Sequence, residues 1–113
     1  MRKEGSMDRR PRLRLDGKVA IVTGAGVQGG AGVGNGKATA ILFAREGARV
    51  VLVDAVREWA ERTQSAIQSE AGEAIVVEAD VCRPDDCRRA VEAGLAHYGA
   101  LHILVNNVGL GAR

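Results

Sequence analysis

The chain has 113 residues, of which 46% are hydrophobic and 27% charged, with a formal net charge of +2, which suits one ordinary globular domain. No apolar run approaches the roughly 20 residues that span a bilayer, and no apolar stretch follows the basic start, so neither a membrane partner nor secretion is predicted. Cys82, Cys87 and the two histidines are too scattered to indicate a metal site, and the lack of a cysteine pattern favours a reducing, cytoplasmic setting.

The positive charge gathers in residues 1–14, which hold six lysines and arginines against two acids. A basic arm of this kind can contact nucleic acid, but it has no interleaved aromatic residue and no periodicity. We therefore expect residues 1–14 to be a disordered leader without a nucleic-acid partner, and residues 15–113 to form a single domain.

Residues 19–22 are a short apolar run bounded by Gly17 and Gly24, which is typical of a strand buried on both faces. A glycine-rich loop follows, and residues 36–46 then favour a helix that ends at Gly47. Glycines let the backbone approach a ligand closely, while the helix start offers free N–H groups and a positive dipole end. This strand, loop and helix therefore predict a phosphate-binding site. One side of the helix holds Ala38, Ile41, Leu42 and Arg45, and small Ala40 and Ala44 allow close approach to the sheet.

Residues 49–53 are a second apolar strand that ends in Asp54, about 20 residues after the last loop glycines. A dinucleotide-binding fold places its ribose-binding acid at this point. There a carboxylate accepts hydrogen bonds from both adenosine ribose hydroxyls, each worth roughly 1.5–3 kcal/mol. Because a 2′-phosphate would meet the carboxylate as a like charge, Asp54 predicts NAD rather than NADP. The alternative is a solvated aspartate that caps the turn into the next helix.

The rest of the chain continues this alternation. We expect a helix over residues 56–69, a strand over 74–78, a helix over 84–98 and a strand over 101–105. The order β-α-β-α-β-α-β with right-handed crossovers predicts an α/β fold. Its core is a Rossmann-like doubly wound parallel sheet with strand order 3-2-1-4, truncated after the fourth strand.

The second and third expected helices have apolar stripes that would pack on this sheet. In the second, the residues at helical spacing are Trp59, Thr63, Ala66 and Ile67, all assigned to packing. The third opens with a proline and acidic residues, and its apolar side holds Val91, Leu95 and Tyr98.

Four motifs in this order resemble the short-chain dehydrogenases/reductases, single-domain oxidoreductases that use NAD(P). They are the run 23–26 with Gly34, Asn35 and Gly36; Asp54; Asp80 with Val81; and the segment 106–109, Asn-Asn-Val-Gly. Together they cover most of residues 15–109. The resemblance implies that residues 15–113 are the N-terminal, dinucleotide-binding part of one Rossmann domain.

The resemblance also implies a role for each motif. The pyrophosphate would lie against the glycine loop and the helix start, the ribose against Asp54, and the adenine between the Asp80 side chain and Val81. Asn106 and Asn107 would steady the central sheet and line the ribose side of the cofactor. The full set of expected cofactor-binding residues is Gly24, Gly26, Gly34, Asn35, Gly36, Asp54, Asp80, Val81, Asn106, Asn107 and Gly109.

The glycine loop departs from the family pattern because residues 27–33 lengthen it by about six residues relative to the usual fingerprint. Which of its N–H groups meet phosphate is left open. Family members that accept a 2′-phosphate usually carry a basic residue just before the middle glycine, where this chain has Val33. NAD therefore remains the expected cofactor.

The catalytic serine, tyrosine and lysine of the family lie after the fourth strand. This chain holds one tyrosine, Tyr98, before that strand and outside a Y-x-x-x-K pattern, so no catalytic residue is assigned. We expect the cofactor-binding portion of an NAD-dependent oxidoreductase that transfers hydride between nicotinamide and a small carbonyl or alcohol substrate. This portion would be inactive by itself and, in the full-length form, part of a homo-oligomer.

Two alternatives stay open at this point. The first is a non-catalytic NAD-binding module or an inactive truncated product, and the second, weaker one is an epimerase or dehydratase with the same fold. In the full fold the fourth strand pairs with a fifth, so truncation after it would leave an apolar edge of the sheet unpaired. We therefore expect the isolated chain to be poorly folded or self-associating.

Overall fold

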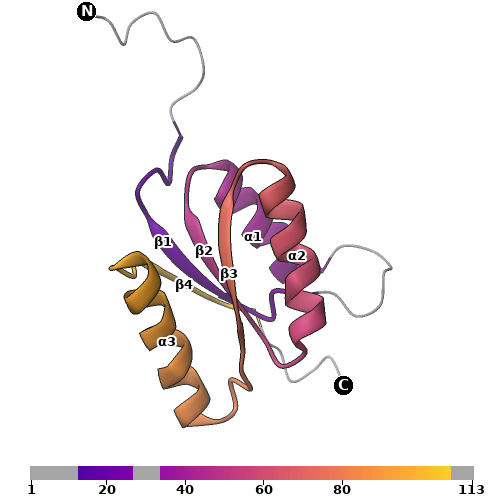
Figure 1. Cartoon of the computed structure of the whole chain (residues 1–113), viewed down its shortest axis with the longest axis vertical. Helices are drawn as coiled ribbons and strands as arrows, with labels where there is room; N and C mark the ends of the chain where they lie inside the picture. Colours follow the sequence, from indigo (N-terminus) through magenta and orange to yellow (C-terminus); the bar gives the residue numbers. More distant parts are fainter. Residues whose placement is uncertain (1–12, 27–33, 108–113) are drawn as a thin grey trace, which may run out of the picture.

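The computed structural model describes residues 13–26 and 34–107, and the expectations for residues 1–12, for the loop 27–33 and for Gly109 lie outside them. Strands and helices alternate in the expected order (Figure 1). Their bounds are β1 Val19–Thr23, α1 Asn35–Arg45, β2 Arg49–Asp54, α2 Arg57–Ser69, β3 Glu73–Glu78, α3 Pro84–Tyr98 and β4 Ile103–Asn106. Each predicted element is confirmed; the bounds of α3 are as predicted, and the ends of the other elements differ by at most two residues.

The strands of the described part of the chain are all parallel and lie in the predicted order β3-β2-β1-β4. Helices α1 and α2 cover one face of the sheet and α3 covers the other (Figure 1). Alternate residues of the inner strands enter the two cores: Val22 and Leu52 face α1 and α2, whereas Ile21 and Val51 face α3. Because β1 is buried along its whole length, its continuous apolar sequence follows from packing on both faces.

Helix α1 is rotated about its axis so that Leu42, which the sequence pattern groups with the apolar side, faces away from the sheet. Gly36 and Ala40 are buried, as expected of small residues that allow close approach, whereas Leu42 is 53% exposed. A side chain at position 36 would overlap the backbone oxygen of Gly24, so glycine lets the helix start pack directly against the end of β1. That contact turns residues 36, 40 and 44 towards the sheet and residues 38 and 42 away from it.

Helix α3 also turns small residues to the sheet. Ala90 and Gly94 are buried, and a Cβ on Gly94 would lie 3.2 Å from Val51 Cγ2. The larger Val91 and Leu95, which the sequence pattern places on the packed side, are 38% and 45% exposed. The expectation for these two residues is wrong, because small side chains let the helix approach the sheet more closely than valine and leucine would.

Strand β4 pairs with β1 and forms an edge of the described sheet. Leu104 on this strand is 67% exposed and lines, with Val91 and other mostly apolar residues, a hollow of about 190 Å³. The strand begins two residues later than expected because the N–H of Val19 donates to His102 Nδ1 at 3.0 Å rather than to a backbone carbonyl of β4. The open apolar edge is as expected, and self-association stays a prediction.

Within residues 13–26 and 34–107, no helix combines the length and apolarity that crossing a membrane requires. The same residues contain no group of three or more histidine, cysteine, aspartate or glutamate side chains that could hold a metal ion. Cys82 and Cys87 are free thiols.

Candidate functional site

The carboxyl ends of β1, β2 and β3 enclose a hollow of about 160 Å³. Its lining consists of Gly24, Val53, Asp54, Ala55, Ala79, Asp80 and Val81. In an open parallel sheet this edge is where ligands bind, next to the point where the strand order reverses, here between β1 and β4. The structure therefore brings Gly24, Asp54, Asp80 and Val81 of the predicted set around one hollow.

Asp54 ends β2 with its carboxylate held by two backbone donors. Oδ1 accepts a hydrogen bond from the Val56 N–H at 2.9 Å, and Oδ2 accepts one from the Gly26 N–H at 3.0 Å. The first bond caps the turn into α2, which is the alternative role that the sequence leaves open for Asp54. The second bond connects the start of the glycine loop to the end of β2. A carboxylate has about four acceptor sites, so each oxygen keeps a lone pair for a ribose hydroxyl. The two interpretations of Asp54 are therefore compatible.

The start of the glycine loop is fixed by β2 and α2. The buried Ala25 donates its N–H to the Val53 carbonyl at 3.2 Å, and its own carbonyl accepts a hydrogen bond from the buried Thr63 hydroxyl at 2.8 Å. Gly26 packs so closely on Trp59 that a Cβ would overlap that residue. The sequence pattern identifies Thr63 only as a packing residue of α2. A hydroxyl within an apolar stripe is the signal that points to a buried hydrogen-bond partner.

At the far end of the loop, α1 begins with its first N–H groups uncovered by any capping side chain. Gly34 is the N-cap residue in an extended conformation, it provides no side-chain cap, and no acidic residue lies in the first turn. Its carbonyl accepts the first helical hydrogen bond, from Ala38 at 2.9 Å. The N–H groups and the positive dipole end at Asn35 and Gly36 can therefore receive an anion such as a phosphate.

The asparagines at the end of β4 bond to the end of β1. The N–H of Asn107 donates to Thr23 Oγ1 at 2.9 Å, and Asn107 Nδ2 donates to the Gly24 carbonyl at 3.4 Å. The Thr23 hydroxyl lies 3.0 Å from Asn106 Oδ1, to which it can donate. Gly24 has a φ of +62°, a conformation that glycine adopts without strain. These bonds join the two strands at the point where the strand order reverses.

Asp80 and Val81 follow β3 on the other side of the hollow. Asp80 is exposed, and its Oδ1 accepts a hydrogen bond from the Cys82 N–H at 2.9 Å. Its own N–H donates to Asp86 Oδ2 at 2.8 Å. This bond is the main reason that the pKa of the Asp86 carboxyl is held below its usual range, and Arg89 acts in the same direction. The sequence pattern identifies Asp86 only as an acidic residue at a helix start.

Tyr98 lies at the opposite end of the sheet from this hollow. Its ring centroid is 6.0 Å from the guanidinium carbon of Arg49, the residue that begins β2, whereas the hollow is at the carboxyl end of the same strand. Burial raises the pKa of Tyr98, which is the reverse of what a tyrosine acid/base needs near neutral pH. The structure therefore gives no reason to assign a catalytic role to Tyr98.

Comparison with known proteins agrees with this geometry. The family model described as short chain dehydrogenase matches residues 18–113. Cyclohexanol dehydrogenase from Acinetobacter sp. (strain SE19) is 37% identical over 97 residues, which cover 86% of this chain and 36% of that protein. The 7alpha-hydroxysteroid dehydrogenase from Escherichia coli (strain K12) is 38% identical over 99 residues, which cover 88% of this chain and 36% of that protein.

Solved structures show the same likeness. A hydroxysteroid dehydrogenase from Escherichia coli aligns with a TM-score of 0.80 at 38% identity, covering 88% of this chain and 40% of that one. A 7-alpha-hydroxysteroid dehydrogenase in complex with NADH and 7-oxo glycochenodeoxycholic acid gives a TM-score of 0.76 at 37% identity, covering 84% of this chain and 35% of that one. The chain thus spans a little over a third of the length of the relatives that it matches. Because the family model matches almost the whole chain and the fold is that of solved members, the chain belongs to the short-chain dehydrogenase family.

Proposed function

We propose that this chain is the dinucleotide-binding part of an oxidoreductase that transfers hydride between NAD(H) and a small carbonyl or alcohol substrate. The observation that carries the proposal is Asp54, whose carboxylate stands at the end of β2 in the wall of the hollow. The related cyclohexanol and hydroxysteroid dehydrogenases, and the NADH in one solved relative, support the same chemistry. When bound, the nicotinamide supplies or accepts the hydride.

Each part of the cofactor has a matching place in the proposed site. The pyrophosphate would lie at the start of α1, where no side chain caps the N–H groups. Asp54 would bind the adenosine ribose, and Asp80 and Val81 would bind the adenine on the opposite wall of the hollow. The proposed residues remain Gly24, Gly26, Gly34, Asn35, Gly36, Asp54, Asp80, Val81, Asn106, Asn107 and Gly109, within one domain over residues 15–113.

The charges around Asp54 support NAD over NADP. A 2′-phosphate at the ribose would meet the carboxylate as a like charge. The nearby Arg57, three residues on, is engaged with Glu61 of the same helix, with Arg57 Nε 3.1 Å from Glu61 Oε2. It would have to leave this ion pair to neutralise a 2′-phosphate. Asp54 therefore sets the preference in the proposed site.

We assign no catalytic residue to this chain. The carboxyl ends of the described strands present glycines, carboxylates and asparagines, which bind and orient a cofactor, but no tyrosine and lysine pair. The relatives extend well beyond the part that matches this chain. We propose that these 113 residues alone bind the dinucleotide without turning over a substrate.

The test is a fluorescence titration with NADH and with NADPH of the protein expressed from its complete reading frame. NADH should bind at least about tenfold more tightly, a difference of about 1.4 kcal/mol. Asp54→Ala should narrow this gap. The matched control is Asp85→Ala, whose carboxyl is 92% exposed in the first turn of α3, and it should change neither affinity. Equal affinities in the unmutated protein would contradict the role of Asp54, and no binding of either would refute the function.

A further inference from the structure

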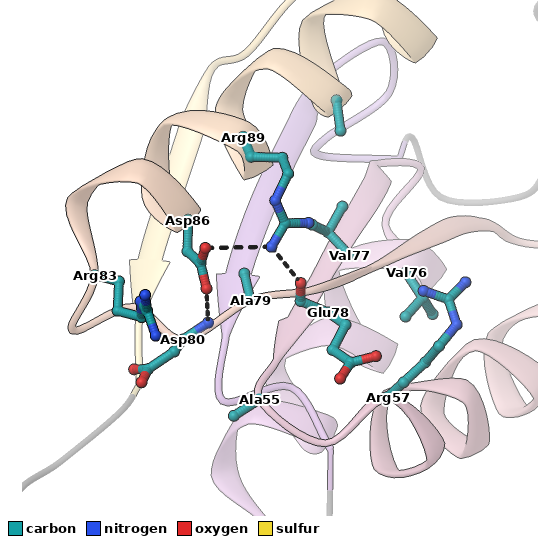
Figure 2. Close-up of a pocket in the computed structure, with 11 residues that line it drawn as sticks. Ala55, Arg57, Val76, Val77, Glu78, Ala79, Asp80, Arg83, Asp86 and Arg89 are labelled. Atoms are coloured by element: carbon teal, nitrogen blue, oxygen red, sulfur yellow. Dashed lines mark hydrogen bonds and ion pairs between the residues drawn. The ribbon is translucent and has the colours of Figure 1, made fainter.

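A groove of about 630 Å³ runs along the outer edge of β3, between α2 and α3. Figure 2 shows its lining, in which arginine and acidic side chains of α3 reach over the end of the strand. The groove shares Ala55, Ala79 and Asp80 with the smaller hollow proposed to receive the adenosine. The side chains on this edge are therefore placed to affect the adenine side of the cofactor site.

Strand β3 lies at the edge of the sheet, so its outward-facing backbone groups have no neighbouring strand. Side chains from the flanking helices take that place. Gln64 Nε2 of α2 donates to the Ala74 carbonyl at 3.0 Å, and Arg89 of α3 donates from a terminal guanidinium nitrogen to the Glu78 carbonyl at 2.7 Å. The second bond secures the last residue of the strand.

Asp86 of α3 makes a similar contact with the segment that follows the strand. Its Oδ2 accepts the hydrogen bond from the Asp80 N–H at 2.8 Å, and its Oδ1 lies 3.5 Å from the guanidinium of Arg89 (Figure 2). On the inner side, the Ala79 N–H donates to the Asp54 carbonyl at 3.0 Å. Three successive residues, 78 to 80, are thus held from both sides, just before Val81.

A neighbouring ion pair on α3 offers a comparison for Asp86 and Arg89, because it has the same spacing but no contact with the strand end. Asp85 and Arg88 form an ion pair with the same spacing, but their side chains are 92% and 66% exposed and bond only to each other among the described residues. The side chains of Asp86 and Arg89 are 26% and 53% exposed, and both reach the backbone of the β3 end. The N-terminal part of α3 therefore carries two similar ion pairs, of which only Asp86–Arg89 contacts the backbone beside the proposed site.

We propose that Asp86 and Arg89 are positioning residues that fix the backbone of residues 78–80, so that Asp80 and Val81 face the adenine. In the proposed arrangement neither side chain would touch the cofactor, and their effect on its affinity would pass through the Glu78 carbonyl and the Asp80 N–H. The inference rests on the proposed function, because it assumes that the hollow binds the adenosine half of a dinucleotide.

The test compares Asp86→Ala and Arg89→Ala with Asp85→Ala and Arg88→Ala in the protein expressed from its complete reading frame. The probes are NADH by fluorescence titration and 5′-AMP as its competitor. We expect Asp86→Ala and Arg89→Ala to weaken both probes by about tenfold, as the loss of one charge-assisted hydrogen bond allows, and the controls to change them by less than twofold. Asp86→Asn keeps an oxygen acceptor for the Asp80 N–H and should recover most of the affinity.

The outcomes separate this inference from the proposed function. If the unmutated protein binds neither NADH nor 5′-AMP, the proposed function fails. If it binds both and the Asp86 and Arg89 variants match their controls, the positioning role is refuted while the function stands. A tenfold loss for NADH without a loss for 5′-AMP would also refute it, because the effect would then not lie at the adenosine half. Should Asp86→Ala fail to fold, the comparison of Arg89→Ala with Arg88→Ala decides.

Discussion

Replacing Thr63 with valine tests how the glycine loop is held. The Thr63 side chain is 0% exposed, and its hydroxyl lies 2.8 Å from the carbonyl oxygen of Ala25, a residue that is also 0% exposed. Valine keeps the shape of threonine but offers no donor, so the buried carbonyl loses this partner. The cost of such a loss is about 1–3 kcal/mol of unfolding free energy. The affinity for NADH should fall as well, because Ala25 leads directly into Gly26 and the loop.

The assay is urea unfolding followed by tryptophan fluorescence. The sequence contains one tryptophan, Trp59, and it packs against Gly26, so the signal reports on the same region. The matched control is Thr63→Ser, which keeps the hydroxyl and loses one methyl group, at about 1 kcal/mol. The serine variant should keep the dissociation constant for NADH near that of the unmutated protein. A valine variant as stable as the unmutated protein, or a serine variant that weakens NADH equally, would refute the reasoning.

Three further predictions concern backbone strain, the open edge of the sheet and pH. Ala71 has a φ of +67°, a backbone conformation that costs a residue with a side chain about 1 kcal/mol. Ala71→Gly should therefore raise the free energy of unfolding, measured in urea, by about 0.5–1 kcal/mol. An unchanged midpoint of urea unfolding would argue against strain at this residue. Leu104→Lys should reduce self-association of the 113-residue chain in sedimentation experiments, because Leu104 is 67% exposed on the edge strand; an unmutated chain that is monomeric at all concentrations contradicts this. The hydrogen bond from the Asp80 N–H lowers the pKa of the Asp86 carboxyl in the folded protein. The ionised Asp86 should therefore stabilise the fold fully above the ordinary aspartate pKa of about 3.9, and this stabilisation should be lost as the pH falls through the lower pKa of the folded state. The difference in urea midpoint between Asp86→Asn and the unmutated protein should therefore shrink towards pH 3, and a difference that grows there would show the opposite sign.

Local patterns in the sequence are sufficient to predict the elements and their order. The apolar run of β1, the glycine that ends each helix region and the spacing to Asp54 each depend on neighbours along the chain. The right-handed crossover rule then leaves few arrangements for four parallel strands. The sequence also places Asp54 correctly at the end of β2, because a strand end is a local feature.

Local sequence patterns do not predict the contacts between segments that are distant along the chain. The rotation of α1 depends on the approach of Gly36 to the Gly24 oxygen, which a helical periodicity cannot show. The partner of the Thr63 hydroxyl lies 38 residues away, and the role of Asp86 depends on how the chain turns after β3. For Thr63 and Asp86 the predicted role is confirmed, but the hydrogen bond that each makes to a distant or later segment follows only from the fold.

The hydrogen bonds around the proposed cofactor site have a common arrangement that bears on how the protein works. Ala25 is held by α2 through Thr63, Gly26 by the end of β2 through Asp54, and Asp80 by α3 through Asp86. Each segment that would face the adenosine half is therefore bonded to a helix or strand other than the strand that it follows. Such cross-links hold the site in shape before a ligand arrives, which lowers the entropy lost on binding. We therefore expect that removing any one of these hydrogen bonds weakens the binding of NADH at the proposed site.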